Sequence, residues 1–472
     1  MPAELGTVTQ VYESSDPSAA GPFLVLIQDA HLNYDAQKNL AAILDQLSEQ
    51  HGLQLVLVEG GSGDVSLTQL RRGPKAIRMK VADQNLKTGL MTGEEYFNMV
   101  ADRPSQLWGV EDPELYDRNF SAFLEVEAVR SRVRSQLTQL RKRVDELIPA
   151  VYNKPLQESL ALEVSFGTGN YPLQDYVRDL ARFGEGTGVD AAAYPEFARY
   201  SEIRRLESSV NLQLIAADQR NAVQEIRGRG SDPALAHLIE TAKQLKALQV
   251  APEVFYAELA EVMARSGVDA QTFPELQRYF RLLNLKKALN VTRLLDDLNR
   301  YTSALCSALA TTPDERALLL IHRGLRADER LIELKWTHAD RVAAQESQET
   351  WRIKNWIPQL NALSSAHQME SLPADLDGAA LDGEMDRCRV FYEVAQERDA
   401  AMAGNVLEKI RESGSRIAVL VVGGFHTDAM SRRFAEAGLE VVVVTPKVGV
   451  VADDGRYERM LKFKQQHREE KS

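Results

Sequence analysis

The stretch IAVLVVGGFH, residues 417–426, decides the fold of this chain. Its first six residues are apolar and mostly β-branched, which is typical of a strand covered on both faces in a parallel sheet. Gly423 and Gly424 then allow the backbone to turn sharply and to approach a bound group closely. His426 follows where the next helix is expected to begin, at the strand end where open α/β sheets bind ligands. The stretch predicts a ligand site; the alternative is a solvated histidine on an ordinary strand-to-helix turn.

The same pattern occurs near the amino terminus. There, the apolar run at residues 23–27 leads into the loop Gln28-Asp29-Ala30-His31. An amphipathic helix is expected at residues 36–49, because leucine and isoleucine recur there every three or four positions. His31 therefore occupies the same kind of place as His426.

Two further apolar runs end in carboxylates. Residues 53–58 lead into Glu59, and residues 106–110 lead into Glu111. A carboxylate at the end of a buried strand is costly to desolvate unless a positive group meets it. The structural alternatives are that Glu59 accepts backbone N–H groups in a loop and that Asp112, which precedes a proline, caps a helix.

These runs predict an α/β fold in which both ends of the chain contribute to one mostly parallel sheet with flanking helices. The expected strands are residues 23–28, 54–58, 106–110, 417–422 and 439–444. Residues 5–12 alternate apolar and polar side chains, which favours an edge strand. We expect residues 1–119 and 385–472 to form the α/β domain and residues 120–384 to form a large α-helical insertion.

The insertion contains an internal repeat. GVDAAAYPEFARY from Gly188 matches GVDAQTFPELQRY from Gly267, an offset of 79 residues because 267 − 188 = 79. The match extends over residues 188–218 and 267–297, which predicts a duplicated helical unit. Two copies are too few for a solenoid, so an antiparallel bundle or arm is expected. Such an arm could contact a protein partner or a second copy of the chain.

The helix expected before residue 417 carries two more polar candidates. Arg398 and Asn405 are seven residues apart, which is two helical turns, so they share one face of that helix. Because the carboxyl ends of parallel strands meet at one edge, this helix can bring both side chains towards Glu59, Glu111 and the two histidine loops.

Together, these motifs resemble those of the TraB/Tiki, erythromycin-esterase and ChaN-like superfamily. The motifs are a strand ending in a histidine loop, a strand ending in Glu-Gly, a helix with Glu397-Arg398-Asp399 and Asn405, and a strand ending in Gly-x-x-His. The resemblance covers residues 23–119 and 385–448. The first loop departs from the family pattern, because Gln28 stands where glycine is usual.

A closer likeness is to bacterial members of this group without an assigned function. It includes TGEEY at residues 92–96 and GVED at residues 109–112. The resemblance therefore implies a site more directly than it implies a substrate.

Two chemistries are open at this site. His31, Glu59 and His426 form a common ligand set for Zn, Mn, Co or another divalent metal, which would acidify a bound water for attack on a carbonyl. Without metal, a histidine polarised by Glu59 would act as general base, the scheme that the esterase branch suggests. In either case Arg398 would stabilise the oxyanion, and Glu111 and Asn405 complete the expected catalytic set.

Three functions from different classes follow. The first is a hydrolase of an ester or amide bond in a peptide or small molecule, metal-dependent as in the Tiki branch or metal-free. The second is a haem- or small-ligand-binding protein as in the ChaN branch, with Tyr34 near His31 as a further iron ligand. The third is a non-catalytic interaction scaffold that acts through the helical insertion.

Composition limits the partners. The 472 residues carry a formal net charge of −12, which argues against nucleic acid or an anionic membrane surface as the main partner. Cys306 and Cys388 are the only cysteines, so neither a disulfide framework nor a cysteine metal site is expected. No apolar run could span a bilayer and no signal peptide is recognisable. The expected location is the cytoplasm, or outside it if a leader is missing from this sequence.

Overall fold

The computed structural model describes residues 2, 4–12, 21–30, 33–103, 105–229, 233–247, 250–347 and 349–448. The chain divides into two compact units. The first comprises residues 1–137, 327–342 and 377–472, and the second comprises residues 138–326 and 343–376. Among the helices of the described ranges, none is long and apolar enough to cross a membrane.

The first unit is built on a sheet whose described strands follow the order β1-β7-β2-β6-β3-β5-β4. The strands are β1 (Gly6–Tyr12), β2 (Phe23–Asp29), β3 (Leu55–Val58), β4 (Ser62–Asp64), β5 (Gln106–Val110), β6 (Ile417–Gly423) and β7 (Glu440–Pro446). β6 lies between β2 and β3 and pairs parallel with both, while β1 and β4 pair antiparallel at the two edges. The predicted α/β class is confirmed: both ends of the chain form one mostly parallel sheet.

The strand β4 was not predicted, because its sequence, SGD, is short and polar. It pairs with β5 at a place where Gly109 faces Gly63 and lies against Gly61. A Cβ atom on Gly109 would lie 2.0 Å from the carbonyl carbon of Gly61, so only glycine allows this approach. This edge pairing depends on contacts between strands that strand periodicity does not report.

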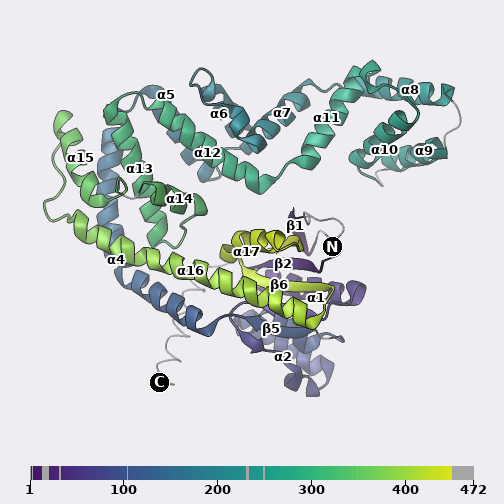
Figure 1. Ribbon diagram of the computed structural model, residues 1–472, viewed down its shortest axis with the longest axis horizontal. Coiled ribbons are helices and arrows are strands. Elements are labelled where there is room, and N and C mark those ends of the chain that lie inside the picture. The colour runs from purple at the N-terminus through teal and green to yellow at the C-terminus, as the bar shows by residue number, and fades with distance from the viewer. Residues whose placement is uncertain are drawn as a thin grey trace. The chain divides into compact units, whose positions relative to one another are not determined.

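Two helical layers cover the sheet (Figure 1). On one face, α1 (Tyr34–His51), α2 (Lys75–Thr88) and α3 (Gly93–Val100) bury leucine, valine and aromatic side chains against alternate strand residues. On the other face, α16 (Gly378–Ser413) and α17 (Gly424–Glu436) do the same. Burial on both faces explains why the central strands are continuous apolar runs.

Two long helices extend beyond the predicted bounds. α4 spans Pro113–Val151 and so crosses residue 119, where the α/β domain was expected to end. α16 begins at Gly378, where Asp377 accepts hydrogen bonds from the backbone N–H groups of Ala379 and Ala380. Consequently the α/β unit takes in residues up to 137 and from 377, with residues 327–342, rather than ending at residues 119 and 385.

The remaining helices lie in the middle of the chain. They are α5 (Lys154–Gly167), α6 (Leu173–Gly184), α7 (Pro195–Ser209), α8 (Leu212–Gly228), α9 (Pro233–Lys246), α10 (Pro252–Arg265), α11 (Pro274–Ala288), α12 (Val291–Leu309), α13 (Pro313–Ile332), α14 (His338–Glu346) and α15 (Ile353–Ala366). The short 3-10 helices are η1 (Thr68–Arg72), η2 (Ala191–Ala193) and η3 (Ala270–Thr272).

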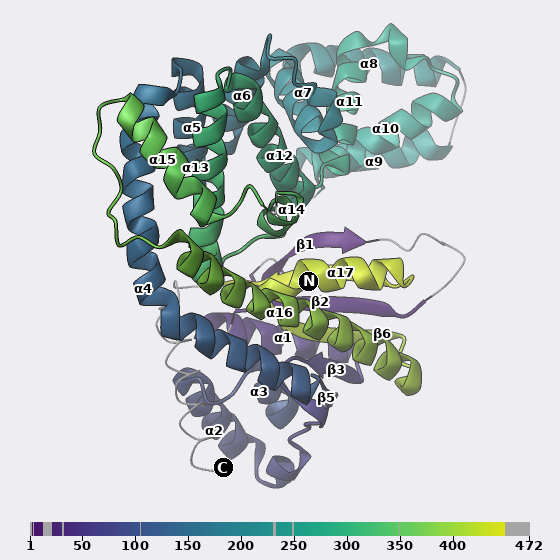
Figure 2. The same cartoon turned by 60° about the vertical axis from the view of Figure 1, so that its left-hand side comes forward.

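The two copies of the sequence repeat fold in the same way. η2, α7 and the start of α8 have the same bounds as η3, α11 and the start of α12 after the 79-residue shift from 188 to 267. α7 and α11 pack against each other side by side (Figure 2). Ile203 and Leu206 of α7 meet Leu282 and Leu285 of α11, which are the equivalent positions of the repeat.

The copies also exchange helix caps. Asp297, near the end of the second copy, accepts a hydrogen bond from the N–H of Glu196 at the start of α7 (2.8 Å). Asp218, the equivalent residue of the first copy, accepts one from the N–H of Glu275 at the start of α11 (2.9 Å). The reciprocity indicates an approximate two-fold relation between the copies.

Candidate functional site

Glu59 stands at the centre of the candidate site, directly after β3. Its Oε2 accepts a hydrogen bond from the N–H of Gly423 at the end of β6 (2.8 Å). Its Oε1 lies 3.3 Å from His426 Nε2 and 3.6 Å from Arg398 Nη2. Both sequence interpretations of Glu59 therefore hold at once: one oxygen accepts a backbone N–H group and the other faces two cationic side chains.

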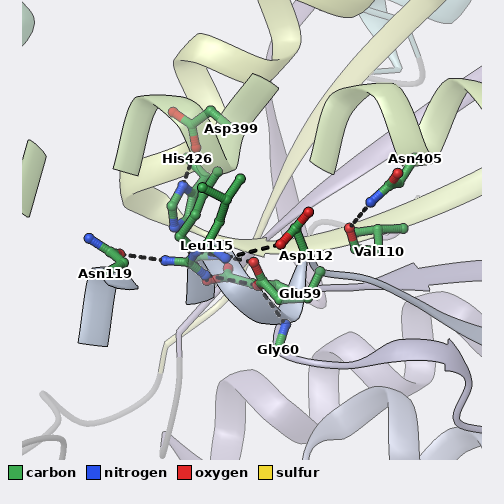
Figure 3. A network of polar contacts seen from close by, with 12 residues as sticks. Glu59, Gly60, Val110, Asp112, Leu115, Asn119, Asp399, Asn405 and His426 are labelled. Carbon is green, nitrogen blue, oxygen red and sulfur yellow. Dashed lines mark hydrogen bonds and ion pairs between the residues drawn. The ribbon is translucent and has the colours of Figure 1, made fainter. Parts of the chain in front are cut away.

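His426 is held between two carboxylates. It lies in the first turn of α17, buried, with Nδ1 bonded to Asp399 Oδ1 and Nε2 directed at Glu59 (Figure 3). Burial by itself lowers the pKa of His426, but the charge of Glu59 and the hydrogen bonds with Asp399 and Glu59 outweigh it and raise the pKa to about 10. The imidazole therefore carries two protons at neutral pH.

Arg398 is the second cation and is fully engaged by neighbours. Its Nε and Nη2 donate to the two oxygens of Glu111 (3.1 and 2.8 Å), the parallel geometry of a bidentate pair. Nη1 donates to Asn119 Oδ1 (2.8 Å), and the guanidinium carbon lies 5.3 Å from the centre of the Tyr116 ring. The side chain is buried, and its charge acts on Glu111 and Glu59.

Glu111 and Asn405 support this arrangement from behind. Glu111 accepts from Arg398 and also from the N–H of Gly60 (3.3 Å), the residue after Glu59. Asn405 donates to the carbonyl of Val110 (2.9 Å), at the end of β5 (Figure 3). Among the bonds of the described residues, neither side chain contacts His426.

Asp112 is a helix cap, the structural alternative considered for it in the sequence. Its Oδ1 accepts the backbone N–H groups of Glu114 and Leu115 (3.0 Å each), so it caps α4 (Figure 3). Capping fixes the direction in which α4 leaves the strand. As a result, Tyr116 and Asn119 of α4 contact Arg398.

Two site residues, Asp399 and Asn119, had no predicted role. The sequence signal for Asp399 is its place in Glu397-Arg398-Asp399, but periodicity could not show that it meets His426, which is 27 residues away. Asn119 is separated from Arg398 by 279 residues, and no local pattern marks it. Both were missed because a hydrogen-bond partner is a property of the folded chain.

The site opens into a cavity of about 620 Å³ that extends over the carboxyl ends of β2, β6 and β3. Glu59, Arg398 and His426 line it on the side of α16 and α17. Asp29 and Glu94 line it on the side of α1 and α3. Apolar residues complete the lining: Val58, Val65, Leu86, Met91, Leu107, Phe120, Phe123, Leu334, Phe391 and Val421.

His31 lies outside the described residues, so its predicted proximity to His426 stays a prediction. Glu59 and His426 supply two of the three proposed metal ligands, and Asp399 holds the other ring nitrogen, as carboxylates do for metal-binding histidines. Against this, Arg398 already faces the same oxygen of Glu59. In the described part of the chain, no group of three or more His, Cys, Asp and Glu side chains is placed to hold a metal ion. A metal site thus depends on His31.

The haem alternative relied on Tyr34, which is engaged elsewhere. Its hydroxyl donates to Asp83 Oδ1 (2.7 Å), and this hydrogen bond, with burial, raises the pKa of Tyr34 to about 12. A tyrosine binds haem iron through its deprotonated oxygen, which a raised pKa opposes. Tyr34 does not belong to the lining of the cavity formed by the described residues.

The chain was also compared with known proteins. No family model, curated protein or solved structure matches it. The resemblance to the TraB/Tiki, erythromycin-esterase and ChaN-like superfamily therefore stays a prediction from the motifs quoted above. A proposal for the function of this chain therefore rests on the geometry of the site.

Proposed function

We propose that the protein hydrolyses an ester or amide bond of a peptide or small molecule in this cavity. The observation that supports the proposal is the placement of His426 between Asp399 and Glu59 at the carboxyl ends of parallel strands. An oriented histidine next to a second ionisable side chain is the arrangement that general acid–base catalysis requires. Open α/β sheets also place their reacting groups at this edge.

Glu59 is the base in the proposed reaction. Because His426 holds its proton at neutral pH, the carboxylate of Glu59 is the group of the pair that can accept a proton from water. This reverses the roles expected from the sequence for a metal-free reaction, in which the histidine was the base. The oxygen of that water bonds to the carbonyl carbon of the substrate as its proton passes to Glu59.

The tetrahedral oxyanion that forms is stabilised by the Nε2–H of the imidazolium. A positive group held in place before the reaction stabilises developing charge without reorganisation. As the carbon–oxygen or carbon–nitrogen bond breaks, the proton held by Glu59 passes to the leaving group, either directly or through His426. The remaining proton leaves with the acid product, so the side chains return to their starting states.

Arg398, Glu111 and Asp399 are positioning residues in this scheme. Asp399 fixes the orientation of the imidazole ring through Nδ1. Arg398, aligned by Glu111, places its Nη2 3.6 Å from Glu59 Oε1 and so holds a positive charge beside that carboxyl group. The scheme uses no metal ion, since the two cationic side chains supply the positive charge.

The decisive experiment compares wild type with Glu59→Gln on a panel of p-nitrophenyl esters and p-nitroanilides. Removal of a general base lowers kcat by a factor of about 10² to 10⁴. The matched control is Glu397→Gln, which removes an exposed carboxylate next to Arg398 that pairs with Arg118 on the surface. Its kcat should stay within about twofold of wild type, because an exposed pair contributes little.

Circular dichroism spectra establish that both variants are folded. Glu59→Gln keeps the size of the side chain, so an effect limited to stability should amount to about 1 kcal/mol. If the panel is turned over and the two variants hydrolyse it equally fast, Glu59 is not the base. If wild type turns over none of the panel and shows no saturable binding of it, the hydrolase proposal fails.

A further inference from the structure

The turn after α13 places a leucine in a backbone conformation that favours glycine. Leu334 has a φ of +55°, in the left-handed region. Its N–H donates to the carbonyl of Leu331 (3.2 Å), and the N–H of Lys335 donates to the carbonyl of Arg330 (2.8 Å). These two bonds define a Schellman motif, whose left-handed position is usually glycine because a Cβ atom is unfavourable there. A strained residue of this kind points to a function of its side chain.

The side chain of Leu334 is half-buried and lines the cavity of the candidate site. Its turn is held by two long helices that also contribute to the lining of this cavity. Before the leucine, Arg130 of α4 donates from Nε to the carbonyl of Ile332 (2.8 Å). After it, the N–H of Trp336 donates to the hydroxyl of Tyr392 on α16 (2.9 Å). Bonds on both sides of Leu334 therefore hold it in the wall of the cavity.

Three phenylalanines line the same cavity. Phe120 and Phe123 belong to α4, with ring centres 6.2 Å apart, and Phe391 belongs to α16. All three side chains are half-buried. The elements that carry them meet at one point of α16, because Phe391 is followed directly by Tyr392, which binds the leucine turn. We call these three side chains together with Leu334 the apolar subsite.

Asn119 joins the apolar subsite to the reacting groups. Its Nδ2 donates to the carbonyl of Phe391 (2.8 Å), and its Oδ1 accepts from Arg398 Nη1 (2.8 Å). Nη2 of the same arginine lies 3.6 Å from Glu59 Oε1. The apolar subsite therefore adjoins the polar site, and a group bound in it leaves the neighbouring bond of the same molecule close to Glu59.

We propose that the apolar subsite binds a hydrocarbon group of the substrate and that Leu334 sets the preference for this group. The position of the bond to be broken rests on the proposed hydrolysis, whereas the preference for hydrocarbon rests on the subsite itself. Each methylene group removed from water favours binding by about fourfold. Pockets lined mainly by apolar side chains select their ligands in this way. The substrate class is therefore an ester or amide with a hydrocarbon group beside the scissile bond.

Affinity for inert alcohols tests the subsite without turnover. The full chain is titrated calorimetrically with 1-octanol and 1-butanol, which differ in chain length and contain no hydrolysable bond. Because each buried methylene group favours binding by about fourfold, 1-octanol should bind at least about 20-fold more tightly than 1-butanol. Leu334→Gly removes the side chain from the wall and should weaken the binding of 1-octanol about tenfold.

Gln368→Gly is the matched control. Gln368 has a φ of +60° and an exposed side chain. It ends α15 with the same two bonds, from its own N–H to the carbonyl of Ser365 (3.2 Å) and from the N–H of Met369 to the carbonyl of Ser364 (2.8 Å). Both glycine variants remove a Cβ atom from left-handed backbone, so neither should lower the urea midpoint of unfolding appreciably. Only Leu334→Gly should change the preference for chain length.

Leu334→Asn provides a second variant if the glycine variant does not fold. Asparagine also tolerates the left-handed conformation, so it keeps the turn while it replaces an apolar side chain by a polar one. It too should weaken the binding of 1-octanol by about tenfold. The preference of wild type for the longer alcohol is measured independently of either variant.

Hydrolysis supplies a second measurement. In one pair of substrates, p-nitrophenyl hexanoate and acetate, the chain lies on the acyl side of the bond. In the other pair, hexyl acetate and ethyl acetate, it lies on the leaving side. The value of kcat/KM should favour the longer chain in one of the pairs, and Leu334→Gly should reduce that preference about tenfold.

The outcomes separate the two proposals. Equal affinity for the two alcohols, binding of neither, or a preference that Leu334→Gly and Gln368→Gly change equally overturns the apolar subsite. Selective binding of 1-octanol that Leu334→Gly weakens, without hydrolysis of any ester or anilide, overturns the hydrolase proposal and leaves the subsite standing. Hydrolysis at the same rate for short and long chains, together with equal alcohol affinities, does the reverse.

Discussion

Replacement of Arg398 by Met tests the strongest electrostatic feature of the site. Methionine keeps much of the length of the side chain but removes the guanidinium. Glu111, which is 5% exposed, loses both bonds from Arg398 and retains the N–H of Gly60 at 3.3 Å. Asn119 loses the donor to its Oδ1. Removing one partner of a buried pair costs about 3–5 kcal/mol, because it strands the other charge.

The assay is urea denaturation followed by tryptophan fluorescence and far-ultraviolet circular dichroism. Hydrogen exchange of residues 106–110, which form β5 next to Glu111, reports on the α/β unit specifically. The control is Arg118→Met. Arg118 pairs with Glu397 at 2.8 Å with both side chains more than half exposed (56% and 51%), so its loss should cost about 1 kcal/mol or less.

A double-mutant cycle isolates the pair. Glu111→Gln removes the buried charge, so the free energy of unfolding lost by the double variant should be smaller than the sum of the two single losses by about 1–3 kcal/mol. Equal losses for Arg398→Met and Arg118→Met would refute the reasoning. So would simple additivity in the cycle.

Two other predictions concern stability. The pKa of His426 is raised from about 6.5 when unfolded to about 10, so the stability it contributes is complete below pH 6.5 and is lost as the pH rises through 10. In urea unfolding at pH 5.5 to 10, the advantage of wild type over His426→Gln should shrink by at most about 1.4 kcal/mol per pH unit; a constant difference would contradict this. Separately, Asp218→Ala and Asp297→Ala should each cost about 0.5–2 kcal/mol as lost helix caps, measured by the same denaturation. The loss should be larger for Asp297, which is 5% exposed, and two variants as stable as wild type would rule out the reciprocal caps.

Much of the sheet could be predicted from the sequence, because a strand covered on both faces has to be apolar throughout. The runs that contain β2, β3, β5, β6 and β7 were each recognised to within two residues at either end. β4 could not be recognised, since its pairing rests on the close approach of Gly61 and Gly109 and not on hydrophobic pattern. The helix bounds were harder to predict, because caps such as Asp377 lie outside the apolar stripe.

In the site, the polar residues at the strand ends were predicted better than the contacts between them. Glu59, His426 and Arg398 are brought together, and Glu111 and Asn405 lie behind them. The protonation of His426 was not foreseen, because it follows from two carboxylates that approach the ring from different elements. Glu94 had no predicted role, although its side chain is buried in the wall of the cavity.

By itself, the sequence determined what depends on the chain near each residue: the apolar strands, the polar residues that end them, and the repeat from residue 188 to residue 267. Hydrophobic periodicity and helix starts are local, since they reflect the solvent exposure of successive side chains. Only the tertiary structure decided that β6 lies between β2 and β3, that Asp399 rather than Glu111 holds His426, and that the repeats exchange caps. Hydrogen bonds and ion pairs act over a few ångströms, so residues hundreds of positions apart acquire their partners only when the chain has folded.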